Sequence, residues 1–211
     1  MKSLTKINTK PKEVFKTKHF ALHFVTIVCV LLSLTSRSHA QGTIVYGQVE
    51  TGSIVSAGQT VSYTLSGNTN DQLFVITVAT SGQLCPMMQL YGPTGTLIGT
   101  AGCYGGQSWW NTITLPSNGT YTLNVSDSSN SNTGNFSIYA QRTNNPGYPV
   151  PLPFAQVQTG TISLAAQSNT YTFSANANDT FLFVTVATSG SLCPYMQLYG
   201  PTGASVAAAG C

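Results

Sequence analysis

The chain carries one segment twice. Residues 47–103 and 155–211 align without a gap at a spacing of 108 positions, and 33 of the 57 aligned residues are identical. The best retained stretch begins at Leu84 and returns at Leu192, and in both copies it contains Cys-Pro and then Met-Gln-Leu-Tyr-Gly-Pro-Thr-Gly. Stacked solenoid repeats recur at roughly 20 to 50 residues. The longer spacing of this repeat therefore predicts a whole domain repeated in tandem.

The first 40 residues have the composition of an export signal. Six lysines precede an apolar run over residues 20–34, and a small-x-small motif ends at Ala40. This order predicts a secretory signal peptide over residues 1–40, cleaved before Gln41, and a secreted protein in the periplasm, the extracellular space or the cell surface. The apolar run is shorter than the about 20 residues that span a bilayer. The alternative is that this run stays uncleaved as a membrane anchor. If the signal is cleaved, no membrane span remains.

Beyond the signal, the chain has very little charge. It retains no Lys or His. Its single basic residue is Arg142, and it has four acidic residues, so its net charge is −3. Nucleic-acid binding needs clustered Lys and Arg side chains, so nucleic acid is excluded as a partner. Without imidazole or amine, no Ser-His-Asp or Cys-His arrangement can form, so the chain is predicted to be no enzyme and to need no cofactor. Asp71 and Asp179 follow asparagine in matching turns, where each is expected to cap the backbone.

Short runs of alternating polar and apolar residues, separated by Gly, Pro, Asn and Ser, fill the first copy. Such runs are typical of β-strands, and no apolar pattern at helical spacing is present. The expected fold class is all-β, with antiparallel, jelly-roll-like β-sandwich modules in tandem. The strands are expected at residues 43–49, 59–66, 72–79, 87–91, 96–100, 109–115, 120–126 and 135–141.

The sequence predicts four segments: the signal peptide, two sandwich domains and the linker between these domains. After the signal come a first sandwich over residues 41–143, a linker over residues 144–153 that holds four prolines, and a second sandwich over residues 154–211. Proline stiffens the linker into an extended spacer. The second copy stops before any counterpart of the last three strands. Either these residues are the front of a longer chain, or the incomplete copy accepts strands from a neighbouring molecule.

Two cysteines recur in each copy. Cys85 and Cys103 lie nine residues on either side of the middle of a Gly-Pro-Thr-Gly turn, and Cys193 and Cys211 repeat this spacing. Residues that face each other across a hairpin are equally distant from its turn, so each pair is expected to form a disulfide. Two ligands per copy are few for a zinc site, and no basic neighbour activates a free thiol. No metal site is expected.

Several motifs of the first copy resemble the bacterial pre-peptidase C-terminal (PPC) domain. They are Gly-Gln-Thr-Val-Ser-Tyr-Thr-Leu from Gly58, Met-Gln-Leu-Tyr-Gly-Pro-Thr-Gly from Met88, Leu-Pro-Ser-Asn-Gly-Thr-Tyr-Thr-Leu from Leu115, and Gly-Asn-Phe-Ser-Ile from Gly134. The resemblance covers nearly all of the first copy and the front half of the second.

The resemblance implies a jelly-roll-like sandwich in secreted bacterial proteins, often beside a peptidase and credited with secretion, solubility or binding to matrix and polysaccharide. Members commonly carry Asp near the positions of Cys85 and Cys103, so here a disulfide replaces the acidic cluster that would bind calcium. We therefore expect a non-catalytic extracellular or cell-surface binding and spacing module. The alternative is the N-terminal accessory region of a longer secreted hydrolase of the peptidase type.

The only dense aromatic cluster holds the candidate contact residues Tyr104, Trp109 and Trp110. Neighbouring residues of a strand face opposite ways. Trp109 shares its parity with Ile113 and is expected in the core, which leaves Trp110 in solvent. An exposed indole can stack on a polysaccharide or contact a matrix or surface protein. The plainer alternative is that Trp110 lies over a loop or the linker.

Overall fold

The computed structural model describes residues 40–211, and the signal peptide predicted for residues 1–40 lies outside them except for its last residue. The described part is all-β, as the sequence predicts. None of its segments forms a helix with the length and apolar character needed to cross a membrane.

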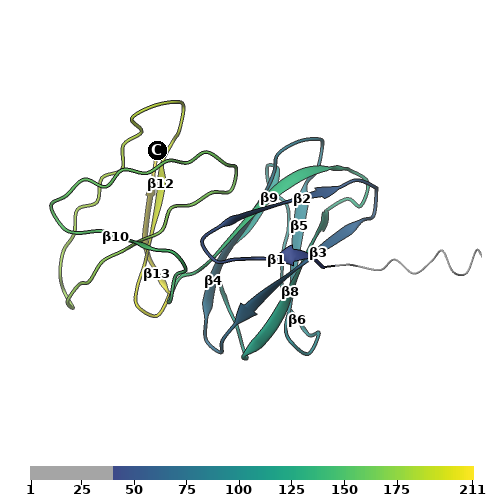
Figure 1. Cartoon of the computed structure of the whole chain (residues 1–211), viewed down its shortest axis with the longest axis horizontal. Helices are drawn as coiled ribbons and strands as arrows, with labels where there is room; N and C mark the ends of the chain where they lie inside the picture. The colour runs from purple at the N-terminus through teal and green to yellow at the C-terminus, as the bar shows by residue number, and fades with distance from the viewer. Residues whose placement is uncertain (1–39) are drawn as a thin grey trace, which may run out of the picture. The chain divides into compact units, whose positions relative to one another are not determined.

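The first repeat is a two-layer sandwich (Figure 1). Five strands in the order β1-β3-β8-β5-β6 form one sheet, and four strands in the order β2-β9-β4-β7 form the other. All neighbours are antiparallel except β1 and β3. The strands are β1 Ala40–Thr43, β2 Val49–Ile54, β3 Thr60–Gly67, β4 Gln72–Ala79, β5 Pro86–Tyr91, β6 Leu97–Ala101, β7 Gln107–Thr114, β8 Gly119–Asp127 and β9 Gly134–Arg142. The order of β2 to β9 is that of a jelly roll, which confirms the predicted fold class.

Alternation along the strands produces the core. In β8, Tyr121, Leu123 and Val125 are buried while Thr122 and Asn124 between them are less so. A strand places successive side chains on opposite faces, so the first set points into the space between the sheets. Each such apolar side chain contributes roughly 1.5–3 kcal/mol when fully buried. The central strands β8 and β9 therefore join their sheets by hydrogen bonds and also supply much of the core.

The strand predicted over residues 43–49 is wrong. β1 ends at Thr43, and a turn in which Gln48 N donates to Val45 O at 3.1 Å separates it from β2. Gly47 in this turn has a φ of 81°, a left-handed conformation that glycine adopts without a Cβ clash. The turn sends the chain from one sheet to the other. The first repeat therefore has one more strand than its sequence pattern predicts.

The linker and the second repeat contain few paired strands: β10 Val150–Pro151, β11 Tyr171–Thr172, β12 Tyr195–Tyr199 and β13 Ser205–Gly210. β10 lies within the predicted linker and pairs with β11 in parallel. β12 and β13 form a hairpin that repeats β5 and β6. Met88 pairs with Ala101 in the first hairpin, and Met196 with Ala209 in the second, each 108 positions later. Identical turn residues therefore give an identical register.

Candidate functional site

Three crossover segments of the first repeat lie together at one end of the sandwich. They are residues 80–85 between β4 and β5, residues 102–106 between β6 and β7, and residues 128–133 between β8 and β9. Each leads from a strand of one sheet to a strand of the other. A crossover has no ladder partner of its own, so its backbone groups need other partners. The contacts that supply them define this crossover end.

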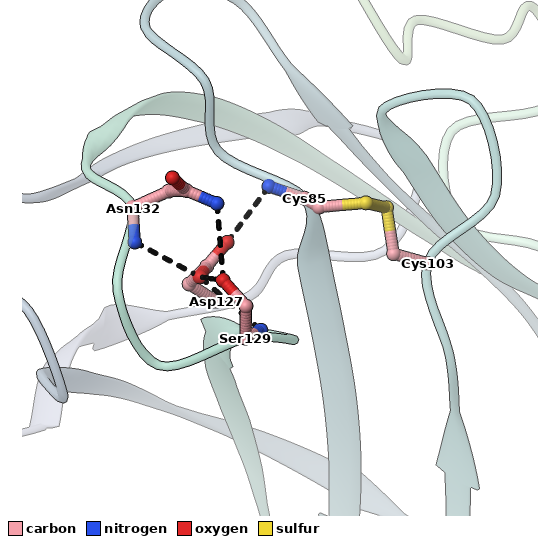
Figure 2. The surroundings of a disulfide bond; sticks show 5 residues. All are labelled: Cys85, Cys103, Asp127, Ser129 and Asn132. Atoms are coloured by element: carbon pink, nitrogen blue, oxygen red, sulfur yellow. Dashed lines mark hydrogen bonds between the residues drawn. A yellow bond between two sulfur atoms is a disulfide. The ribbon is translucent and has the colours of Figure 1, made fainter.

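A disulfide joins the first two crossovers. Cys85 directly precedes β5, Cys103 follows β6, and the two are bonded with their Cα atoms 5.5 Å apart (Figure 2). The β5–β6 ladder places them there, because its last pair, Met88 with Ala101, lies just inside the bond. The second predicted disulfide is also present, between Cys193 and Cys211, with Cα atoms 5.7 Å apart.

The third crossover is held by the buried carboxylate of Asp127, the last residue of β8. Its Oδ1 accepts a hydrogen bond from Cys85 N at 3.0 Å. Its Oδ2 accepts from Ser129 Oγ at 2.6 Å and from the backbone nitrogens of Ser129, Ser131 and Asn132 at 3.2, 3.1 and 3.0 Å. Figure 2 shows Cys85, Ser129 and Asn132 around the carboxylate, beside the disulfide.

The electrostatics of Asp127 follow from these contacts. Burial by itself raises the pKa of a carboxyl, since it penalises the charged form. Here the hydrogen bonds from Ser129, Cys85, Asn132 and Ser131 outweigh burial and hold the pKa of Asp127 well below its usual range. The carboxylate is therefore charged at neutral pH and engaged by protein donors on both oxygens. This site orders a loop, and the residue pattern of the chain did not predict it.

Backbone hydrogen bonds connect the crossovers further. Ser128 N donates to Cys85 O at 2.8 Å, Ala79 N donates to Gly106 O at 2.8 Å, and Thr80 N donates to Asn135 O at 2.8 Å. Each bond links a different pair of neighbouring segments. Together with the disulfide and Asp127, they fix the crossover end as one unit.

The crossover between β6 and β7 ends in a tight turn. Tyr104 N donates to Gln107 O at 2.8 Å, and Gln107 N donates to Tyr104 O at 3.1 Å. The two residues between them, Gly105 and Gly106, have φ angles of 58° and 78°. Two left-handed residues between a doubly bonded pair make a type I′ turn, for which Gly-Gly is well suited. This turn sets the direction of the Tyr104 side chain.

Tyr104 and Trp109 form an exposed aromatic surface, which we call the aromatic ledge. Their ring centroids are 6.5 Å apart at an interplanar angle of 75°, an edge-to-face arrangement. Tyr104 is 75% exposed and Trp109 is 37% exposed. The turn and the adjacent disulfide hold these rings without burying them, so a partner would meet a largely preformed surface.

The predicted orientations of the two tryptophans are wrong, and a β-bulge explains why. Leu73 pairs with Ile113 and Val75 with Trp110, so a step of two residues along β4 matches a step of three along β7. The extra residue reverses the alternation. Trp110 and Ile113 consequently share a face and pack against the core, while Trp109 faces outward.

Glycine in the opposite sheet accommodates the indole of Trp110. A Cβ atom built on Gly99 of β6 would lie 3.7 Å from Trp110 Cζ2 and 2.8 Å from Ile113 Cδ1. Both side chains therefore lie over the bare backbone of β6. Of the three candidate contact residues, the structure brings Tyr104 and Trp109 together at the surface and leaves Trp110 partly buried against the core.

The two turn aspartates cap the backbone as predicted. Asp71 Oδ2 accepts from Asn68 N at 2.9 Å, and Asp179 Oδ2 accepts from Asn176 N at 2.8 Å. Asp71 also lies 3.9 Å from the Arg142 guanidinium. Within residues 40–211, no three His, Cys, Asp or Glu side chains gather closely enough to hold a metal ion. Asp71, Asp127 and Asp179 thus serve the structure, and the exposed feature of the crossover end is the aromatic ledge.

Comparisons with known proteins give similar folds at low identity. No family model matches the chain, and no curated protein matches it. The pre-peptidase C-terminal domain of a collagenase from Bacillus anthracis is similar at 13% identity and a TM-score of 0.41, over 49% of this chain and 97% of that domain. The chain is also similar to PliG, a periplasmic inhibitor of g-type lysozyme, from Aeromonas hydrophila and from Salmonella Typhimurium. The identities are 19% and 16%, both TM-scores are 0.33, and the matches cover 49% of this chain and 100% and 98% of those chains. At these TM-scores the likenesses carry no argument about function.

Proposed function

We propose that this chain is an exported, non-catalytic β-sandwich protein that binds an extracellular or cell-surface polysaccharide through the aromatic ledge. The observation that carries the proposal is the exposure of Tyr104, on a turn beside a disulfide, and of Trp109, in the strand that follows the turn. Aromatic faces offer a large contact area and lose little side-chain entropy when they bind. Each repeat contains one disulfide, and the first 40 residues have the composition of an export signal. Both features support an oxidising destination outside the cytoplasm.

The chemistry of the described chain favours stacking over charge recognition. Beyond the signal, Arg142 is the only base, and it lies beside Asp71. An anionic ligand therefore finds no basic patch on residues 41–211. A neutral sugar ring has apolar faces that pack on an indole or phenol, and this contact needs no charge. The second repeat and the proline-rich residues between the copies then act as a spacing element.

A titration with soluble polysaccharides tests the proposal. Residues 41–211 are titrated with each glycan while tryptophan fluorescence is recorded, because both tryptophans of the chain lie in the first repeat. Tyr104→Ala should weaken binding about tenfold, the equivalent of about 1.4 kcal/mol. Tyr148→Ala is the matched control, since Tyr148 is an equally exposed tyrosine outside the ledge. A flat response to every glycan, or equal losses in both variants, would contradict the proposal.

A further inference from the structure

The second repeat exposes apolar residues that its twin buries. Ile54 is 1% exposed and its identical counterpart Ile162 is 38% exposed. Leu84 is 4% exposed and its identical counterpart Leu192 is 48% exposed. The residue type is the same in both copies, and the flanking residues are similar. The difference therefore lies in what covers these side chains.

In the first repeat, the covering elements are β7, β8 and β9. β8 lies between β3 and β5, and β9 lies between β2 and β4, while β7 pairs with the other side of β4. Without these three strands, the only ladder left among β2 to β6 is the β5–β6 hairpin. The corresponding hairpin, β12 with β13, is the one ladder that residues 155–211 form among themselves (Figure 1).

Phenylalanines gather in place of a core in the second repeat. Phe173, Phe181 and Phe183 correspond to the fully buried Leu65, Leu73 and Val75. Their ring centroids lie 5.2 to 5.9 Å apart, and all three stay only half-buried. The rings therefore contact each other where the first repeat has the side chains of two facing sheets.

A charge is left without its partner in the same repeat. Arg142 of β9 lies 3.9 Å from Asp71, and Asp179 occupies the equivalent position 108 residues later. No Lys or Arg occurs in residues 143–211. A segment equivalent to β9 would bring a guanidinium to Asp179 together with the apolar residues that the sheet needs.

We infer that residues 155–211 form an acceptor surface for a three-strand antiparallel segment with the pattern of residues 107–142. The first repeat fixes the expected register. Leu65 pairs with Tyr121 and Leu90 with Leu123, so the equivalents of Tyr121 and Leu123 pair with Phe173 and Leu198. The equivalent of β8 thus inserts between residues 168–175 and β12, by addition of strands to open sheet edges.

The test extends the chain by a second copy of residues 104–142, placed directly after Cys211. Amide hydrogen exchange is measured over residues 168–175 and 180–187 in the original and extended proteins. Because these amides then enter ladders on both sides, their exchange should slow by about 100-fold or more. The matched control carries Leu123→Asp in the appended copy alone, which places a charge at a buried position. The control should exchange as fast as the original protein.

Two results would overturn the inference. In the first, the extension leaves exchange over residues 168–175 and 180–187 unchanged, or the extended chain aggregates while amides of β3 in the first repeat stay protected. In the second, the original protein already protects these amides and loses the protection on dilution, which would assign the surface to a second copy of the chain. Exchange in β3 serves as the internal reference for all three proteins.

Discussion

Replacing Asp127 with asparagine removes one charge and one acceptor oxygen and preserves the size of the side chain. The carboxylate accepts five hydrogen bonds, four of them from backbone nitrogens. In the variant, an amide NH₂ group faces some of these donors, which then lack an acceptor. A hydrogen bond to a charged group contributes about 1.5–3 kcal/mol, and an unsatisfied buried group costs about 1–3 kcal/mol. Since these effects overlap, the free energy of unfolding should fall by about 3 kcal/mol.

Urea unfolding of residues 41–211, followed by tryptophan fluorescence, measures this loss in the first repeat, where both tryptophans lie. Asp179→Asn is the matched control, because Asp179 caps an exposed turn of the second repeat. We expect the control to change the transition by less than about 0.5 kcal/mol. A loss below about 1 kcal/mol for Asp127→Asn would refute the claim that the carboxylate holds the crossover end together.

The same pair of proteins yields a pH dependence of known sign. The folded pKa of Asp127 lies below its unfolded value, so its stabilisation is present above the unfolded pKa of about 3.9 and is lost as pH falls through the folded pKa. The stability gap between the natural protein and Asp127→Asn should be full at neutral pH and narrow below about pH 4. The other carboxyls cancel, because both proteins carry them. A gap that stays constant into acid would contradict this account.

Three further predictions concern the same end of the sandwich. Replacing Cys85 and Cys103 together by serine should cost about 3 kcal/mol in the chain-entropy model, as measured by urea titration, and reductant should no longer affect the first repeat of the double variant. Gly106→Ala should cost about 1–2 kcal/mol, because the residue has a φ of 78°, and a raised Tm would disprove the turn assignment. Trp110→Ala should cost about 3 kcal/mol and Trp109→Ala less than about 1 kcal/mol in melts followed by circular dichroism, whereas equal losses would argue against the bulge.

Local patterns in the sequence were sufficient for the fold class and for the disulfides. Alternation of polar and apolar residues is a local property, and it locates β3, β4, β5, β8 and β9 to within two residues of their observed bounds. The Cys85–Cys103 bond follows from distance to a turn, which is also local. Both predictions need only the short-range geometry of a strand or hairpin.

The candidate site depends on features that the local pattern does not record. The orientation of Trp109 and Trp110 is set by one extra residue in β7, and the sequence shows no glycine or proline that marks the bulge. The role of Asp127 depends on its contact with Cys85, 42 residues earlier. Its sequence signal was the polar run that follows it, since Asp before Ser and Asn is typical of a side-chain-capped turn.

The strand order has a consequence for the time at which a repeat folds. Ser126 of β8 pairs with Thr60, and Arg142 of β9 pairs with Leu73, so the strands that close both sheets are the last to be synthesised. A ribosome releases the chain from its N-terminus, so the β5–β6 hairpin is the only antiparallel ladder that can close before β7 emerges, and the sheet of β2, β9, β4 and β7 stays incomplete until residue 142 has emerged. A nascent repeat therefore remains unfolded through most of its synthesis, which keeps it threadable through a translocation pore.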